Sequence, residues 1–248
     1  MALAISLPAE KIAQIGSFPI TNSLLTSWIV SAIFVVGALI ISRQNKKVPG
    51  KFQNAVEMIV EGLFNFTSQI IGSASTTKKY FPLLVTLFIF IIINNWIGLL
   101  PGVGSIGFWG QHHGQTVLIP LLRGANADLN MTIALALISV TMIHLYGVNA
   151  LGLGAHLSKF FNFKGLIEAF VGLLELISEF SKVISFAFRL FGNIFAGEVL
   201  LMVISSLVPV FAAIPFYFLE IFVGFVQALV FMMLTVVFIK VHTAHHSH

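Results

Sequence analysis

The 248-residue sequence contains no cysteine and few charged residues, and each shortage excludes a class of protein. Without cysteine there are no disulfides, thiolate metal sites or cysteine nucleophiles, and the redox compartment cannot be inferred. Charged residues make up 9% of the chain, against about 25% in soluble domains. Because so few charges cannot cover a water-facing surface, we expect the chain to lie in lipid, in agreement with its 58% hydrophobic content.

Other familiar sequence signals are also missing. Roughly the first twenty residues lack a basic start, an apolar core and a cleavage site, so Met1 is expected to belong to the mature protein. There is no phosphate-binding glycine loop, catalytic triad or haem-ligand pattern, so we expect no cofactor. The net charge of +4 comes from basic residues in short loops beside apolar runs. That placement is typical of membrane topology and not of a nucleic-acid partner.

Apolar runs of about 20 residues, the length that crosses a bilayer, predict an all-α integral membrane protein with one membrane domain and five membrane helices. The expected helices cover 22–42, 81–101, 129–153, 165–207 and 216–241, after an extracellular segment at 1–21.

Residues 51–72 show apolar positions at helical spacing with polar residues on the remaining faces. This pattern predicts an amphipathic helix lying in the membrane interface, although a helix packing on a protein partner would look similar.

The basic residues are distributed unequally between the two sides of the predicted topology. Nine lie on the side of the C-terminus, which the positive-inside rule therefore places in the cytoplasm, and the N-terminus outside. These nine are Arg43, Lys46, Lys47, Lys51, Lys78, Lys79, Lys159, Lys164 and Lys240, against Lys11 and Arg123 on the other side.

The predicted helix at 165–207 is too long for an upright crossing. It would extend roughly 65 Å at 1.5 Å per residue, whereas the hydrocarbon core is about 30 Å thick. We therefore expect it to tilt steeply or to begin along the interface.

Acidic residues, lysine and arginine occur only in the last two predicted spans, because the first three contain no Asp, Glu, Lys or Arg. Each costs at least about 2.5–3.5 kcal/mol near the bilayer centre, so each is a functional candidate. The candidates are Glu175, Glu179, Lys182, Arg189, Glu198 and Glu220.

Three of these charges have no opposite charge at helical spacing. Glu179 precedes Lys182 by one turn and can pair with it. Arg189, Glu198 and Glu220 have no such neighbour. Their partners must therefore come from another helix, another subunit or water.

Helical geometry separates the candidate roles. At 100° per residue, Glu175, Lys182, Arg189 and Asn193 form one polar stripe. Glu198 lies on the side of the helix opposite Arg189, about 13 Å beyond it along the helix axis. An arginine stays protonated, whereas a carboxylate can exchange a proton. A fixed cation beside exchangeable carboxylates is what a two-sided proton path requires.

Structural roles remain possible for the same residues. Arg189 could form an Arg–Glu pair that holds the last two helices together, and Glu198 and Glu220 could make ordinary interhelical hydrogen bonds. Polar amides such as Asn193 and Gln227 also serve as packing contacts in membranes. Gly192 and Ala196, four residues apart, would allow a neighbouring helix to approach closely.

The histidines considered as metal ligands are scattered and lack a nearby carboxylate, so no metal site is expected. Those at the C-terminus are interpreted as a solvated tail. The set comprises His112 and His113, in a loop with Trp109, and His242, His245, His246 and His248.

Several motifs resemble subunit a (ATP6-like) of F-type ATP synthases. The run SFAFRLFGNIFAGE at Ser185–Glu198 is similar to that family's R-L-F-G-N-x-x-A-G-E segment. The runs NADLNMT at 126–132 and QALVFMMLT at 227–235 resemble two further family motifs, and Glu175 and Lys182 match positions upstream of the arginine.

The resemblance implies a non-catalytic, proton-translocating subunit in a bacterial-type plasma or inner membrane. Its partners would be a rotating c-subunit ring, the b-subunit peripheral stalk and the lipid bilayer. Arg189 would face the ring between two half-channels.

The resemblance also implies that the last two helices form a long, strongly tilted hairpin, and it assigns the polar residues of that hairpin. Glu198 and Glu220 would line the external half-channel near Asn193 and Gln227, and Glu175 would lie toward the cytoplasmic one. Some bacterial members carry histidine at the position of Glu220, so this residue departs from part of the family.

Two other functions fit the sequence less well. A secondary transporter would usually show internal repeats, and none is visible in this sequence. A purely structural membrane subunit would not explain three locally unpaired charges in one hairpin.

Overall fold

A computed structural model describes most of the chain, namely residues 8–43, 50–100, 102–112, 115–158, 160, 165–207 and 213–243. Within these residues, five helices are long and apolar enough to cross a membrane, which confirms the predicted all-α membrane class. Outside the described residues lie 1–7, Lys46, Lys47, Pro101, His113, Lys159, Lys164, Pro209 and the histidines at 245, 246 and 248.

The helices follow the predicted ranges closely. In chain order they are α1 (Asn22–Arg43), α2 (Lys51–Ile71), α3 (Ala74–Ile97), α4 (Leu129–Leu151), α5 (Leu153–Leu157), α6 (Leu166–Leu207) and α7 (Ala213–Thr243). The strands are β1 (Lys11–Ile15), β2 (Phe18–Thr21), β3 (Gly107–His112) and β4 (Gln115–Pro120).

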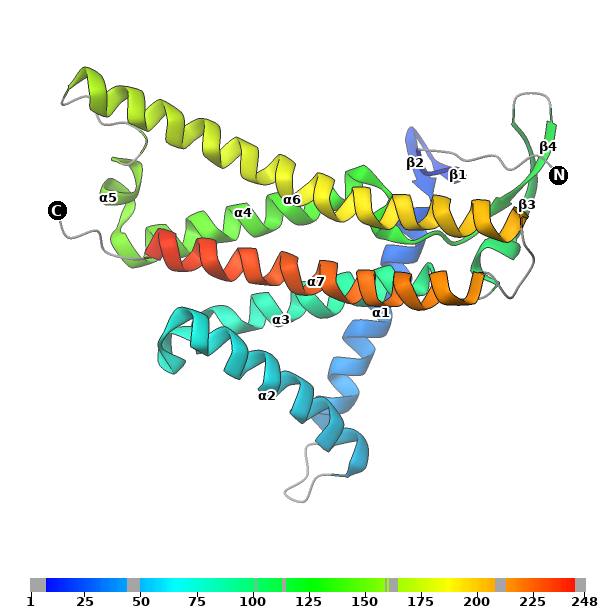
Figure 1. Cartoon of the computed structure of the whole chain (residues 1–248), viewed down its shortest axis with the longest axis horizontal. Coiled ribbons are helices and arrows are strands. Elements are labelled where there is room, and N and C mark those ends of the chain that lie inside the picture. The colour runs from blue at the N-terminus through cyan, green and yellow to red at the C-terminus, as the bar shows by residue number, and fades with distance from the viewer. Residues whose placement is uncertain are drawn as a thin grey trace.

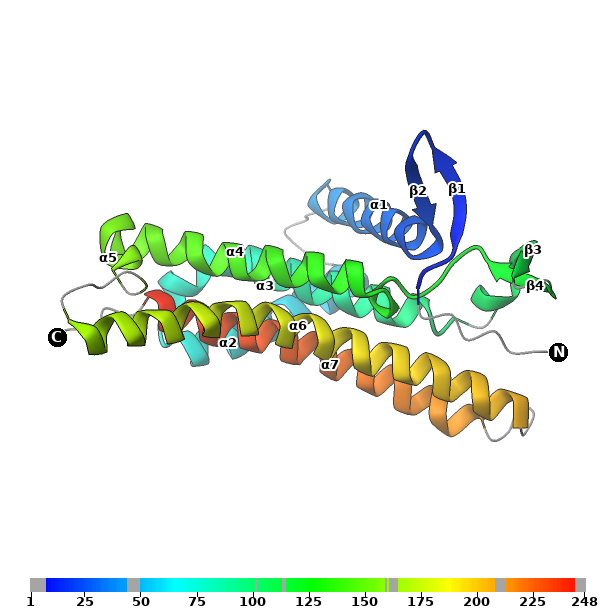
Figure 2. The same ribbon diagram turned by 90° about the horizontal axis from the view of Figure 1, so that it is seen from above.

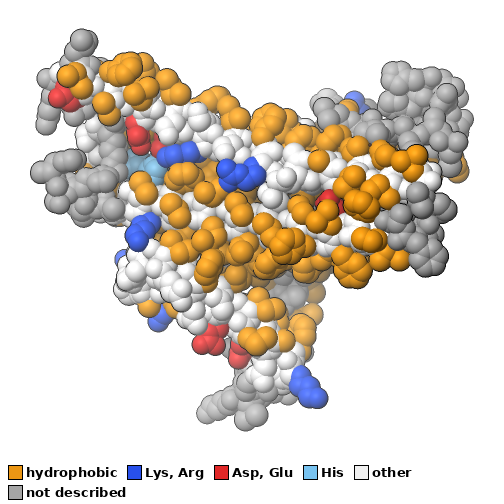
Figure 3. Space-filling view, in the orientation of Figure 1, with side chains coloured by type: hydrophobic (Ala, Val, Ile, Leu, Met, Phe, Trp, Pro, Cys, Tyr) orange, Lys and Arg blue, Asp and Glu red, His pale blue; other side chains and the backbone are white. Residues whose placement is uncertain are grey.

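Four helices form the body of the molecule. α3, α4, α6 and α7 pack together along the long axis, and α1 crosses them at a steep angle (Figure 1, Figure 2). Their shared core includes the fully buried side chains of Leu84, Ile91, Ile143, Leu190 and Met232. Apolar side chains also cover much of the face shown in Figure 3, and many large hydrophobic residues are exposed, as lipid requires.

Helix lengths indicate how steeply each helix crosses a bilayer. The 22 residues of α1 span about 33 Å and fit an upright crossing. The 42 residues of α6 span about 63 Å and the 31 of α7 about 46 Å, so both must tilt. Because α3 and α4 run along them, we infer that all four are tilted, whereas the sequence indicated tilt only for the last two.

The N-terminal end of α1 is held by polar contacts. Ser23 Oγ donates to Asp128 Oδ2 at 2.6 Å, and both residues are buried. Asp128 also caps α4 by accepting from the backbone N–H of Asn130 at 2.9 Å. This motif residue therefore joins the first span to the start of the fourth helix.

Several helix ends differ from the sequence prediction: α3 ends at Ile97 and not at residue 101, and α7 covers Ala213–Thr243 and not 216–241. α3 begins at Ala74, before the expected residue 81, because the Ser73 side chain caps it, and it contains Pro82 in its interior. α4 ends at Leu151, two residues early, because Gly152 takes a positive φ of 85°. The short α5 then turns back toward α4.

Strands appear where loops were expected. Within the described residues, β1 pairs with β2 and β3 with β4, each as an antiparallel hairpin. Phe108 and Trp109 on β3 are 61% and 66% exposed. Both hairpins lie toward the end of the molecule opposite the last turn of α7 (Figure 1).

The amphipathic helix α2 packs on α3 and α7 along one face. Thr67 is buried and Leu63 packs against the core, whereas Phe52 and Met58 on another face are 71% and 70% exposed. The Lys240 ammonium donates to the carbonyl of Ile70 at 2.6 Å. The end of α7 and the end of α2 thus lie together, as expected if they share one side of the membrane.

Candidate functional site

Arg189 lies at the middle of α6 with its side chain exposed. Its guanidinium donates to Ser185 Oγ at 3.2 Å, one turn earlier on the same helix. Among the described residues, no carboxylate lies within 4.0 Å of it. Asn193 donates to the Arg189 carbonyl at 2.9 Å, so this side-chain amide is hydrogen-bonded within its own helix. The Arg–Glu pair within the hairpin is therefore not formed.

The surface around Arg189 is open. A methyl group built on Gly192 would meet no atom within 4 Å among the described residues, so the close helix approach considered at this glycine does not occur here. Figure 3 shows basic side chains over α6 on a face that carries many hydrophobic side chains. A cation on an apolar face requires a partner from outside this chain or from water.

Glu198 has a partner that the sequence did not reveal. The guanidinium of Arg123, in the connection before α4, donates to both carboxylate oxygens of Glu198 at 3.1–3.2 Å. Arg123 is 7% exposed and Glu198 is 34% exposed. The Arg123 backbone N–H also donates to Thr26 Oγ1 on α1 at 3.2 Å. The pair therefore joins α6 to the end of the molecule where α1 begins.

Glu220 on α7 points at the backbone of α6. Its side chain is 6% exposed. A methyl group built on Gly197 would overlap the Glu220 carboxylate, so the glycine leaves the space that this carboxylate occupies. Gly197 directly precedes Glu198 in the chain. The packing thus places Glu220 against the same turn of α6 that carries Glu198.

A buried amide pair fixes α3 against α7 near Glu220. Asn126 donates to Asn95 Oδ1 at 2.7 Å, and Asn95 donates to the carbonyl of Gly224 at 2.8 Å. Trp96 Nε1 donates to the carbonyl of Ile221 at 3.0 Å. Gln227, one turn beyond Gly224, is half-buried on α7.

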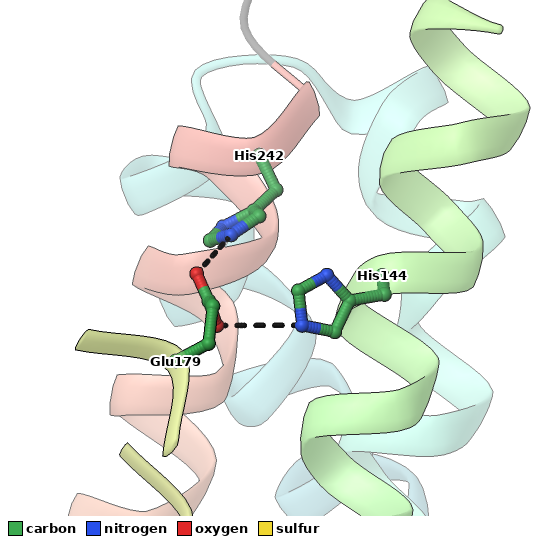
Figure 4. Close-up of side chains that lie close together, drawn as sticks. All are labelled: His144, Glu179 and His242. Atoms are coloured by element: carbon green, nitrogen blue, oxygen red, sulfur yellow. Dashed lines mark hydrogen bonds and ion pairs between the residues drawn. The ribbon is translucent and has the colours of Figure 1, made fainter. Parts of the chain in front are cut away.

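At the other end of the hairpin, Glu179 is the centre of a basic cluster. The predicted pair with Lys182 is confirmed, with Nζ 2.6 Å from Oε1. His242 Nε2 lies 2.9 Å from Oε1, and His144 Nε2 lies 3.3 Å from Oε2 (Figure 4). His156 Nε2 contacts His144 Nδ1 at 3.1 Å. We call these five residues the histidine cluster.

The interpretation of His242 as part of a solvated tail was wrong. α7 continues to Thr243, and His242 is 2% exposed because it packs between α4 and α6. His144 and His156 were missed altogether. A histidine within an apolar run is itself a functional signal, and His144 lies in such a run.

A pocket of about 260 Å³ connects the cluster with Arg189. Its lining includes Lys182 at one end and Arg189 at the other. Ser178, Ser181 and Ser185 also line it, and Ser185 lies between Lys182 and Arg189 along α6. Glu175 is half-buried on α6, one turn before Glu179.

Comparison with known proteins decides the family. The profile described as "ATP synthase A chain" matches residues 24–240. ATP synthase subunit a of Campylobacter jejuni subsp. doylei is 35% identical over 211 residues, which is 85% of each chain. The subunit a proteins of Desulforamulus reducens and Geotalea daltonii are 34% and 30% identical, over 91% and 88% of this chain and 80% and 86% of theirs.

The chain belongs to the ATP synthase subunit a family. The resemblance to F-type subunit a is thereby confirmed. The chain is a multi-pass membrane component of the ATP synthase membrane sector, with a role in proton translocation. The match from residue 24 to 240 contains Arg189, Glu198, Glu220 and every residue of the histidine cluster except His242.

Proposed function

We propose that this subunit provides two proton half-channels that meet a rotating ring of c subunits on either side of Arg189. The observation that carries the proposal is that the Arg189 side chain is exposed and has no carboxylate within 4.0 Å among the described residues. Acidic groups lie to both sides of it along α6: Glu179 about 15 Å before it and Glu198 about 13 Å after it. Such an arrangement separates two carboxylate sites with one fixed positive charge.

The external half-channel would run past Glu220 and Glu198. Glu220 is buried against Gly197, and Glu198 is one-third exposed beside Arg123. A buried carboxylate that approaches a partly exposed one can accept a proton from water and pass it inward. Asn193 and Gln227 would complete the polar lining near the ring.

The cytoplasmic half-channel would begin at the pocket beside Arg189. Its serine hydroxyls and Lys182 extend from Arg189 toward the end of the α6–α7 hairpin where α6 begins and α7 ends. Glu175 and the neighbouring histidine cluster would then deliver the proton to the cytoplasm. Lys78 and Lys79 at the start of α3 and the contact between Lys240 and Ile70 support the assignment of this end to the cytoplasmic side.

Arg189 would act through its permanent charge. When a protonated carboxyl group of the ring approaches, the guanidinium stabilises the carboxylate form and favours release of the proton. The same charge opposes direct proton passage between the two half-channels. Rotation of the ring then becomes the favourable route for each proton.

The remaining assignments follow from this role. The subunit would form one membrane domain in a bacterial-type energy-coupling membrane, with the N-terminus outside and the C-terminus in the cytoplasm. It would bind the c ring through the face of α6 that carries Arg189, and the b-subunit peripheral stalk elsewhere. Synthesis of ATP would occur in a separate catalytic head.

Replacement of Arg189 tests the proposal. In vesicles containing the whole synthase, Arg189→Ala should abolish ATP synthesis driven by a proton gradient. Arg189→Lys should fail as well, because a desolvated lysine can lose its proton whereas arginine keeps its charge. Arg43→Ala, at the exposed end of α1, is the matched control and should retain synthesis. Normal coupled synthesis in either Arg189 variant would refute the barrier role.

A further inference from the structure

Three side chains of the histidine cluster converge from three different helices. His144 comes from α4, Glu179 from α6 and His242 from α7, and one ligand atom of each lies within 4.8 Å of the others (Figure 4). His242 and Glu179 are buried, and His144 is partly exposed. Convergence of two imidazoles and a carboxylate is a recurring donor set of protein zinc sites.

The orientation of both imidazoles is fixed by their second nitrogen atoms. His242 Nδ1 lies 2.9 Å from the carbonyl of Phe238. A carbonyl can only accept, so Nδ1 donates to it, and Nε2 is the atom that faces Glu179. Nε2 donates to the carboxylate when it carries a proton and offers its lone pair to a metal ion when it does not. His144 Nδ1 is engaged by His156, which leaves Nε2 facing the same carboxylate. Metal-binding histidines are typically held in this way, by a carbonyl or side chain behind the ring.

We propose that His144, Glu179 and His242 form a binding site for a divalent transition-metal ion of the zinc class. Zinc takes nitrogen and carboxylate ligands at about 2.0–2.2 Å, often three from protein with a water in the fourth position. Tetrahedral bonds of that length separate the donor atoms by about 3.4 Å. His242 and His144 contact different oxygens of Glu179, at 2.9 Å and 3.3 Å. One ligand atom of each residue lies within 4.8 Å of the others, so these atoms must approach by up to about 1.4 Å to reach this spacing. Magnesium and calcium, which prefer all-oxygen sites, do not suit this set.

Lys182 is the competitor for the site. Its ammonium contacts Glu179 Oε1 at 2.6 Å and lies 4.8 Å from the centre of the Phe238 ring. A metal ion bound to Glu179 would repel this ammonium. The displaced ammonium could move into the adjacent pocket, because Lys182 already lines that pocket together with three serines. Metal binding would therefore include a change of the Lys182 rotamer.

Occupation of the site would also affect transport, and this consequence rests on the proposed function. The ion would join α4, α6 and α7 at the proposed proton exit and move a lysine toward Arg189. We therefore expect zinc on the cytoplasmic side to inhibit passive proton flux through the membrane sector.

The direct test is metal binding by the intact membrane sector. Because the sequence carries three more histidines at 245, 246 and 248, all variants are made in a background where these are changed to serine. Zinc affinity is measured by competition with a chromophoric chelator, and cobalt absorption reports the coordination geometry. His144→Gln and His242→Gln should each weaken zinc binding by at least roughly ten- to a hundredfold, the loss seen even for outer-shell partners.

Two further variants distinguish a metal site from general damage to the fold. Glu175→Gln, one turn from Glu179 on the same helix, should leave zinc affinity unchanged. Lys182→Gln should tighten zinc binding, because it removes the competing ammonium while the ligands remain. Equal affinity in all variants, or weaker binding in Lys182→Gln, would overturn the proposal. Zinc binding that leaves proton flux unchanged would keep the metal site and instead contradict the exit path of the proposed function.

Discussion

Replacing Gly197 with alanine would place a methyl group in the space that the Glu220 carboxylate occupies. Either the Glu220 side chain must rotate away or α6 and α7 must separate. Overpacking of this kind typically costs about 1–3 kcal/mol, partly offset by the roughly 0.8–1.0 kcal/mol by which alanine exceeds glycine in helix propensity. The fold should therefore survive with only a modest loss of stability.

The effect on transport should be larger than the effect on stability. If Glu220 must lie against Gly197 to carry protons, a penalty of about 1–3 kcal/mol on that position lowers its population roughly 5- to 150-fold. Passive proton flux through vesicles stripped of the catalytic head should fall by a similar factor. A pH-sensitive dye inside the vesicles measures this flux.

A control and a rescue make the Gly197 experiment decisive. Gly62→Ala on α2, where an added methyl group meets nothing within 4 Å, should leave flux unchanged. Gly197→Ala combined with Glu220→Asp should recover part of the flux, because the shorter side chain draws the carboxylate back from the new methyl group. Wild-type flux in Gly197→Ala, or no recovery in the double variant, would refute the reasoning.

Three more outcomes are expected. Glu198→Gln and Glu220→Gln should each slow passive proton flux, and the double variant should lose less than the sum of the two, since neighbouring carboxylates on one path are coupled; strictly additive losses would argue for separate paths. Arg123→Gln should lower the thermal stability of the solubilised membrane sector by about 1 kcal/mol, because Glu198 is partly solvated, and Arg123→Lys by less; an unchanged melting temperature would mean that the pair contributes nothing. Asn126→Leu should cost about 1 kcal/mol in the same assay, from two buried hydrogen bonds of roughly 0.6 kcal/mol each, and a stabilising effect would contradict that estimate.

The sequence by itself determined the class of protein and the position of its helices. A long apolar run in lipid forms a helix, because every backbone N–H and C=O group must find its hydrogen-bond partner within the segment. The same helical period showed that Arg189 has no acidic neighbour on its own helix. Those conclusions depend only on residues close together in the chain, and the structure agrees with them.

Only the tertiary structure decided the contacts between distant residues. Arg123 reaches Glu198 across 75 positions, and His242 reaches Glu179 across 63. Such pairings depend on the order, rotation and tilt of the packed helices, which hydrophobic periodicity does not specify. The sequence favoured Glu175 as the cytoplasmic carboxylate because it matches a motif. The packing instead surrounds Glu179 with histidines from α4 and α7, because these helices bring their polar faces to that turn of α6.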